Sequence, residues 1–206
     1  AIEYFEKKKG FSFMGIFSFM QKKAIFFLIQ GKYQLSEIEI QKSFKYLRKE
    51  NALSLQSLFN YLFIIKLNQA DYNQNYLILS KVFKLKGFNK LNDTFREPWY
   101  LKEAFVHFLI RVGKIDTAAF PEVKLRAFRL SRFINEVPTY SKDKKGFNIT
   151  INIIQMLFLL LDRKYDRFLN KLQSLKQYNY RYLRDEKYIR PSSFIKMMGK
   201  IPVGRY

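Results

Sequence analysis

The chain has 206 residues, enough to bury a sizeable core in one elongated domain or two small ones. It has no cysteine, which excludes disulfides, cysteine-ligated zinc, iron–sulfur clusters and thiol catalysis, and we expect a cytoplasmic protein. Lys and Arg number 38 against 17 Asp and Glu, so the net charge of +21 reflects either an anionic partner or a compositional bias towards Lys, Asn, Ile, Phe and Tyr.

The first ten residues have the pattern of a helix end. Ile2 and Phe5 share one face, and Gly10 stands where a left-handed stop is expected. Since the chain also begins with Ala and not Met, we expect it to be the C-terminal part of a longer protein. The longest apolar runs, 24–29 and 149–161, are shorter than the ~20 residues of a membrane-spanning helix, so no membrane span is predicted.

One plan then recurs four times along the chain. An apolar helix runs into a short polar turn, and an aromatic or aliphatic residue opens a second helix. These opening residues are 39, 43 and 50 residues apart, and they are Tyr33, Tyr72, Ile115 and Tyr165. The pattern predicts an all-α superhelix, a solenoid of about four helical hairpins. We place the hairpins near 14–49, 53–88, 98–137 and 148–185, within a domain over 1–190, followed by a capping helix and tail over 191–206.

The second helix of the third hairpin is predicted to begin at Pro121, because a missing N–H is harmless in a first helical turn. Its apolar face consists of Val123, Ala127, Leu130 and Ile134. The second helix of the fourth hairpin is predicted to bury Phe168, Leu172, Leu175 and Tyr182.

Residues 140–147 form the most loop-like stretch. Residues 148–153 alternate as a strand would, but the apolar run continues to Leu161 without a partner strand, which favours a helix. A short terminal helix is expected from Pro191 to Met198.

The first hairpin resembles the tetratricopeptide repeat family. Its small, aromatic, glycine and large apolar positions follow the family spacing, and they are Ala24, Phe27, Gly31, Tyr33, Ser36, Ile40 and Ser43. The third hairpin keeps Gly113, whereas the fourth has Arg163 where glycine is usual, and the second keeps little beyond Ala70 and Tyr72. The resemblance implies a scaffold whose concave face, lined by the first helices, binds peptides or proteins.

The sequence contains no recognisable catalytic or cofactor-binding motif. His107 is the only histidine, so we predict a structural or surface role and no metal site. Asp162 and Asp166 stand among Arg163, Lys164 and Arg167, which indicates surface ion pairs. No phosphate-binding glycine loop occurs. We therefore predict a protein that is not an enzyme and needs no cofactor.

Two basic clusters are candidate surfaces for an anionic partner. The first runs along the last long helix among several tyrosines and contains Arg163, Arg167, Lys171, Arg181 and Arg184. The second contains Lys124, Arg126, Arg129 and Arg132. Arginine with aromatic neighbours is typical of single-stranded nucleic acid binding, but a solvated helix face with half-buried tyrosines explains the same pattern and is the interpretation we favour. The predicted function is a protein or peptide interaction scaffold, with nucleic-acid binding as the alternative.

Overall fold

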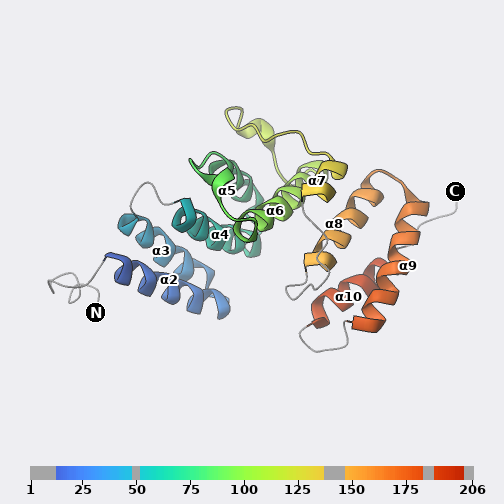
Figure 1. Ribbon diagram of the computed structural model, residues 1–206, viewed down its shortest axis with the longest axis horizontal. Coiled ribbons are helices and arrows are strands. Elements are labelled where there is room, and N and C mark those ends of the chain that lie inside the picture. Colours follow the sequence, from blue (N-terminus) through green and yellow to red (C-terminus); the bar gives the residue numbers. More distant parts are fainter. Residues whose placement is uncertain (1–12, 48–51, 137–146, 183–187, 202–206) are drawn as a thin grey trace. The chain divides into compact units, whose positions relative to one another are not determined.

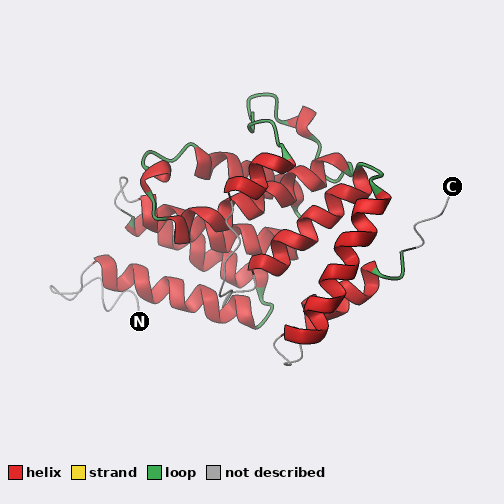
Figure 2. Cartoon of the chain, turned by 45° about the vertical axis from the view of Figure 1, so that its right-hand side comes forward, coloured by secondary structure: helices red, strands yellow, loops and turns green. Residues whose placement is uncertain are grey.

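The computed structural model describes residues 13–47, 52–136, 147–182 and 188–201, and within these ranges the chain is all-α, with no strand (Figures 1 and 2). The predicted fold class is thus confirmed. The chain divides into two compact units, residues 1–126 and 127–206, which are described separately. The helix end predicted over residues 1–10 and most of the loop predicted over 140–147 lie outside the described ranges.

Unit 1 is a succession of helix pairs. Each helix packs on the next one along the chain, from α2 through to α6, as Figure 1 shows. The helices are α2 (Phe13–Ile29), α3 (Tyr33–Ser43), α4 (Ala52–Asn68), α5 (Tyr72–Phe83) and α6 (Asp93–Arg111), with short 3₁₀ helices η1 (Phe44–Tyr46), η2 (Phe88–Lys90) and η3 (Thr117–Ala119). Its core includes the fully buried Ile40, Leu58, Leu79 and Trp99.

Unit 2 is built around one long helix pair. Its helices are α7 (Leu130–Glu136), α8 (Phe147–Leu161), α9 (Tyr165–Tyr182) and α10 (Ile189–Met198). Helix α9 packs on both α8 and α10. The helix predicted over 148–153 is confirmed as part of α8, and the terminal helix is confirmed with a start at Ile189. On α9, Phe168, Leu172 and Leu175 are buried as predicted, but Tyr182 is 61% exposed.

All four predicted turns adopt the same backbone geometry. A left-handed residue follows the first helix in each hairpin: Gly31 (φ +71°), Ala70 (+57°), Gly113 (+70°) and Arg163 (+56°). In the first turn the Gly31 N–H donates to Leu28 O and the next N–H donates to Phe27 O, at 3.0 and 2.9 Å, and the other three turns repeat both bonds. This is the Schellman helix end, which reverses the chain and satisfies the last carbonyls of the helix.

The first two hairpins also share a buried side-chain bond. The Ser36 hydroxyl donates to the Ala24 carbonyl at 2.8 Å, and the Asn75 amide donates to the Phe63 carbonyl at 2.8 Å. Ser36 and Asn75 occupy the same position after their turns, and both are completely buried. Asn75 thus occupies the position of the small Ser36 and makes the same kind of hydrogen bond to the preceding helix. The sequence pattern does not reveal this similarity between the two hairpins.

The fourth hairpin repeats the buried positions of the first. Met156, Phe168, Leu172 and Leu175 are spaced as Ala24, Ser36, Ile40 and Ser43 are, and all eight residues are buried. Met156, Phe168 and Leu175 in unit 2 therefore fill positions that small residues fill in the first hairpin, and Leu172 takes the position of the equally large Ile40.

The helix predicted to begin at Pro121 does not form, and this prediction is wrong. Residues 115–129 contain η3 as their one helical turn, and α7 begins only at Leu130. The proline disfavours helical backbone in the residue before it, and Phe120 accordingly leaves the helical region at φ −135° and ψ 62°. The 3₁₀ turn therefore ends at Ala119.

Residues 115–126, here called the strap, pack against unit 1 instead. Phe120, Val123 and Leu125 lie against its core, and the Tyr76 hydroxyl donates to the Val123 carbonyl at 2.6 Å. The strap thus covers the side of α5 and α6 that a second helix of the third hairpin would be expected to cover.

Candidate binding pocket

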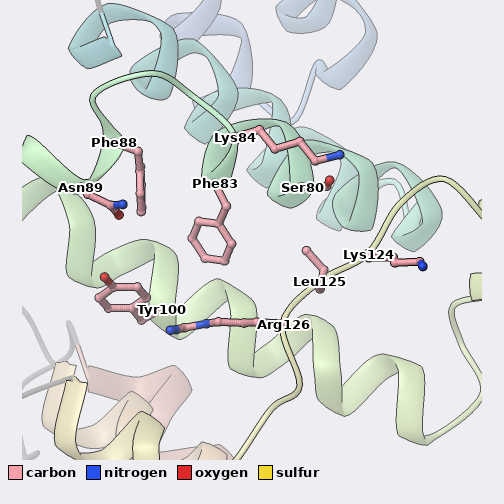
Figure 3. Close-up of a pocket in the computed structure, with 9 residues that line it drawn as sticks. All are labelled: Ser80, Phe83, Lys84, Phe88, Asn89, Tyr100, Lys124, Leu125 and Arg126. Atoms are coloured by element: carbon pink, nitrogen blue, oxygen red, sulfur yellow. The ribbon is translucent and has the colours of Figure 1, made fainter.

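An open pocket of about 310 Å³ lies in unit 1 between α5, η2, α6 and the strap (Figure 3). Its lining combines aromatic rings with polar and cationic side chains: Ser80, Phe83, Lys84, Phe88, Asn89, Tyr100, Lys124, Leu125 and Arg126.

Aromatic side chains form the floor of this pocket. The Phe83 ring lies 5.2 Å from the Phe88 ring and 6.3 Å from the Tyr100 ring, measured between centroids. Gly87 makes this arrangement possible, because its φ of +91° turns the chain after α5 and leads directly into Phe88. Helices α5 and α6 and the turn between them therefore place three rings at one spot.

Arg126 forms one wall and is held in place by a buried carboxylate. Its guanidinium makes two hydrogen bonds to Glu103, at 2.6 and 2.5 Å, and Glu103 is only 2% exposed. The same guanidinium lies 5.2 Å from the Tyr100 centroid and 5.9 Å from that of Phe83, within the range of a cation–π contact. Figure 3 shows the side chain reaching towards Tyr100. Arg126 therefore anchors the strap, and its charge is balanced.

Two lysines at the rim of the pocket, unlike Arg126, are not paired with any buried carboxylate that the structure describes. Lys84 follows α5, Lys124 lies in the strap, and both side chains are exposed. Among the described residues no carboxylate lies within ion-pairing distance of either ammonium group. The pocket therefore combines an apolar floor with two cations whose charge is available to a ligand.

Lys102 is a further unusual cation, on the α4-facing part of α6. Its ammonium lies 4.8 Å from the Trp99 ring centroid and 5.8 Å from that of Phe63, and it donates to the Pro98 carbonyl at 3.4 Å. Burial lowers the pKa of Lys102 to about 8. Nothing in the sequence pattern singled out this lysine, because its burial depends on aromatic rings from two different helices.

The first predicted basic cluster is partly brought together on α9. Arg167 and Arg181 are exposed, whereas Lys171 is half-buried and its burial lowers its pKa. Arg163 is the left-handed residue of the turn before α9, and Arg184 lies outside the described residues. The rings of Tyr178 and Tyr182 lie 4.9 Å apart. The 100° step of a helix puts Tyr178 on the side of Arg167 and Lys171, and it puts Tyr180 on the opposite side.

The second predicted cluster is divided between the units. Lys124 and Arg126 belong to unit 1, whereas Arg129 and Arg132 belong to unit 2. Arg132 donates to the Ala127 carbonyl at 2.6 Å, and Arg129 is exposed.

Other predicted residues have local surroundings that suit structural roles. His107 is half-buried on α6, and Lys164 forms an ion pair with Asp162 at 3.2 Å. The described ranges contain no group of three or more side chains suited to holding a metal ion. Within the same ranges, every helix falls short of the length and apolar character needed to cross a membrane.

Comparison of the chain with known proteins gave no matching family model, no matching curated protein and no matching solved structure. Functional inference therefore rests on the geometry of the two units.

Proposed function

We propose that this chain is a non-catalytic scaffold of tetratricopeptide-like helical hairpins that binds a peptide segment of a partner protein. The observation that carries the proposal is the open pocket of unit 1, with its aromatic floor and its exposed Lys84 and Lys124. Pockets of this kind, with apolar lining and a few polar groups, are where ligands usually bind.

The hairpin array adds support from a second feature. Helix α2 is the first described helix of the array, and several of its apolar residues are exposed. On α2 such residues are Phe19, Phe26 and Ile29, which are 46, 56 and 81% exposed. Exposed apolar side chains that line one side of a helix are typical of interaction surfaces.

Selection from a library of random displayed peptides tests the proposal. We expect enriched peptides that bind the purified chain saturably in solution, as measured by fluorescence anisotropy, and that stay bound in the presence of excess RNA. A selection without enrichment, or peptides that RNA displaces, would contradict a peptide-binding scaffold.

Nucleic-acid binding is a second candidate, and it is favoured by α9. Arg167, Lys171 and the paired rings of Tyr178 and Tyr182 lie on adjoining parts of this helix, and such a combination suits phosphates and stacked bases.

Titration with labelled single-stranded RNA at rising salt tests this candidate. Each phosphate contact gives a slope of about 0.7 in log affinity against log salt. The double variant Arg167→Ala/Arg181→Ala is expected to lower that slope, whereas Lys196→Ala/Lys200→Ala, exposed lysines of the same unit, serves as the control. Absence of binding at low salt excludes the candidate.

A further inference from the structure

We propose that the pocket of unit 1 receives one apolar side chain of an acidic peptide segment, whose carboxylates lie near Lys84 and Lys124. This inference rests on the proposed function and names the chemistry of the partner.

The size of the pocket indicates a side chain and not a whole ligand. Its volume of about 310 Å³ is at the lower end for sites that enclose a small molecule, and it is open to solvent. An anchor residue of a larger partner needs no more room than this, since the rest of the partner covers the opening.

The floor selects apolar chemistry. Phe83, Phe88 and Leu125 offer no hydrogen-bonding side-chain atoms, and the Arg126 guanidinium is already bonded to Glu103. The uncharged polar groups of the lining are those of Ser80, Asn89 and Tyr100. A polar side chain packed against Phe83, Phe88 and Leu125 would lose water without gaining a hydrogen bond from them. A leucine or a similar side chain would bury apolar surface instead.

The rim selects negative charge. Lys84 directly follows α5 and Lys124 lies in the strap, and both are exposed. Glu103, the buried carboxylate behind the pocket wall, is neutralised by Arg126. The exposed Glu122 lies two residues before Lys124 along the strap and offsets part of its charge, but Glu122 is not among the lining residues, and the rim keeps an excess of positive charge from the two lysines. An acidic segment is therefore attracted and a basic one is repelled.

The experiment uses a fluorescein-labelled peptide in which one central leucine is flanked by glutamates, and anisotropy measures its Kd for the whole chain. One comparison peptide has serine in place of the leucine, and another has lysines in place of the glutamates. We expect the serine peptide to bind about tenfold more weakly, in line with the loss of one buried apolar side chain. The lysine peptide is not expected to bind.

Charge reversal locates the site. Lys84→Glu and Lys124→Glu are each expected to weaken binding by about threefold to tenfold, as befits exposed charges. Lys114→Glu, an exposed lysine of the same unit outside the pocket, is expected to change Kd by less than about twofold. These positions are exposed, and circular dichroism melting confirms that each variant folds as the parent does.

The outcomes separate this inference from the proposed function. No saturable binding of the glutamate–leucine peptide, equal binding of the lysine peptide, or equal losses from Lys84→Glu and Lys114→Glu would each overturn the assignment of the pocket. The scaffold function would still stand if displayed peptides bind elsewhere, and it would fail if none binds at all.

Discussion

The second and third hairpins of unit 1 begin in the same way and then diverge. After α4 and after α6 the chain makes the same left-handed turn, at Ala70 and at Gly113, with the same pair of hydrogen bonds. The first of these turns leads into the twelve residues of α5, whereas the second leads into the strap, which contains only the short helix η3. The turn thus sets only the reversal of the chain. Pro121 ends η3 by keeping Phe120 out of the helical region, and the residues after it pack on unit 1 without forming a helix.

This difference also explains why a pocket exists. A helix advances 1.5 Å per residue, and an irregular chain advances further, so the strap brings fewer side chains to the surface of α5 and α6 than a helix would. Val123 and Leu125 cover part of that surface, and Arg126 closes one end by binding Glu103. The space between them is the pocket.

The largest effect is expected from releasing the strap. Arg126→Ala leaves the carboxylate of Glu103 buried without its partner, which costs about 3–5 kcal/mol in the free energy of unfolding. Trp99, the single tryptophan, lies in the core of unit 1, so its fluorescence in urea reports this unit. Lys124→Ala, an exposed neighbour on the strap, is the control, with an expected change below about 0.5 kcal/mol. Equal effects would show that the strap is not anchored through Arg126.

A pH titration examines the other side of α6, where Lys102 meets Trp99 and Phe63. The folded pKa of Lys102 is about 8 and its ordinary value is 10.5, so between these pH values the unfolded chain binds more protons. The free energy of unfolding of the parent should therefore rise with pH across this window relative to Lys102→Met, by at most about 3 kcal/mol. Urea unfolding at several pH values measures this. Parallel curves for the parent and the variant would contradict the burial of the ammonium group.

The buried hydrogen bonds of Ser36 and Asn75 allow a test of whether the first two hairpins are stabilised in the same way. Ser36→Ala and Asn75→Ala each remove a buried donor to a helix carbonyl, and each is expected to cost about 1–2 kcal/mol. The exposed neighbours Gln34→Ala and Gln74→Ala provide matched controls near zero. If only one of the two buried substitutions were destabilising, the two hairpins would not be held by the same interaction.

The smallest effect concerns the four turns. Ala70→Gly and Arg163→Gly relieve a left-handed conformation that a side chain disfavours, and each should stabilise its unit by about 1 kcal/mol, while Gly113→Ala should destabilise by a similar amount. Thermal melting of the three variants provides the measurement. Opposite signs would mean that these turns do not keep their left-handed residue in solution.

Much of the fold is predictable because it depends on local pattern. Apolar periodicity predicts the helices, and the turn residues predict all four reversals, even where Arg163 replaces glycine. The candidate site is a different case. Lys124 and Arg126 were singled out for their charge, but charge alone did not separate an exposed rim lysine from an arginine bonded to a buried glutamate.

What the sequence by itself determined is most of the helices and the four places where the chain reverses, since both follow from interactions between residues a few positions apart. Tertiary structure alone decided that the strap would replace a helix, that Lys102 would lie beneath two rings, and that Phe83, Tyr100 and Leu125 would line one pocket. These features join residues far apart in the chain, and the free energy that selects them comes from packing that no local pattern contains.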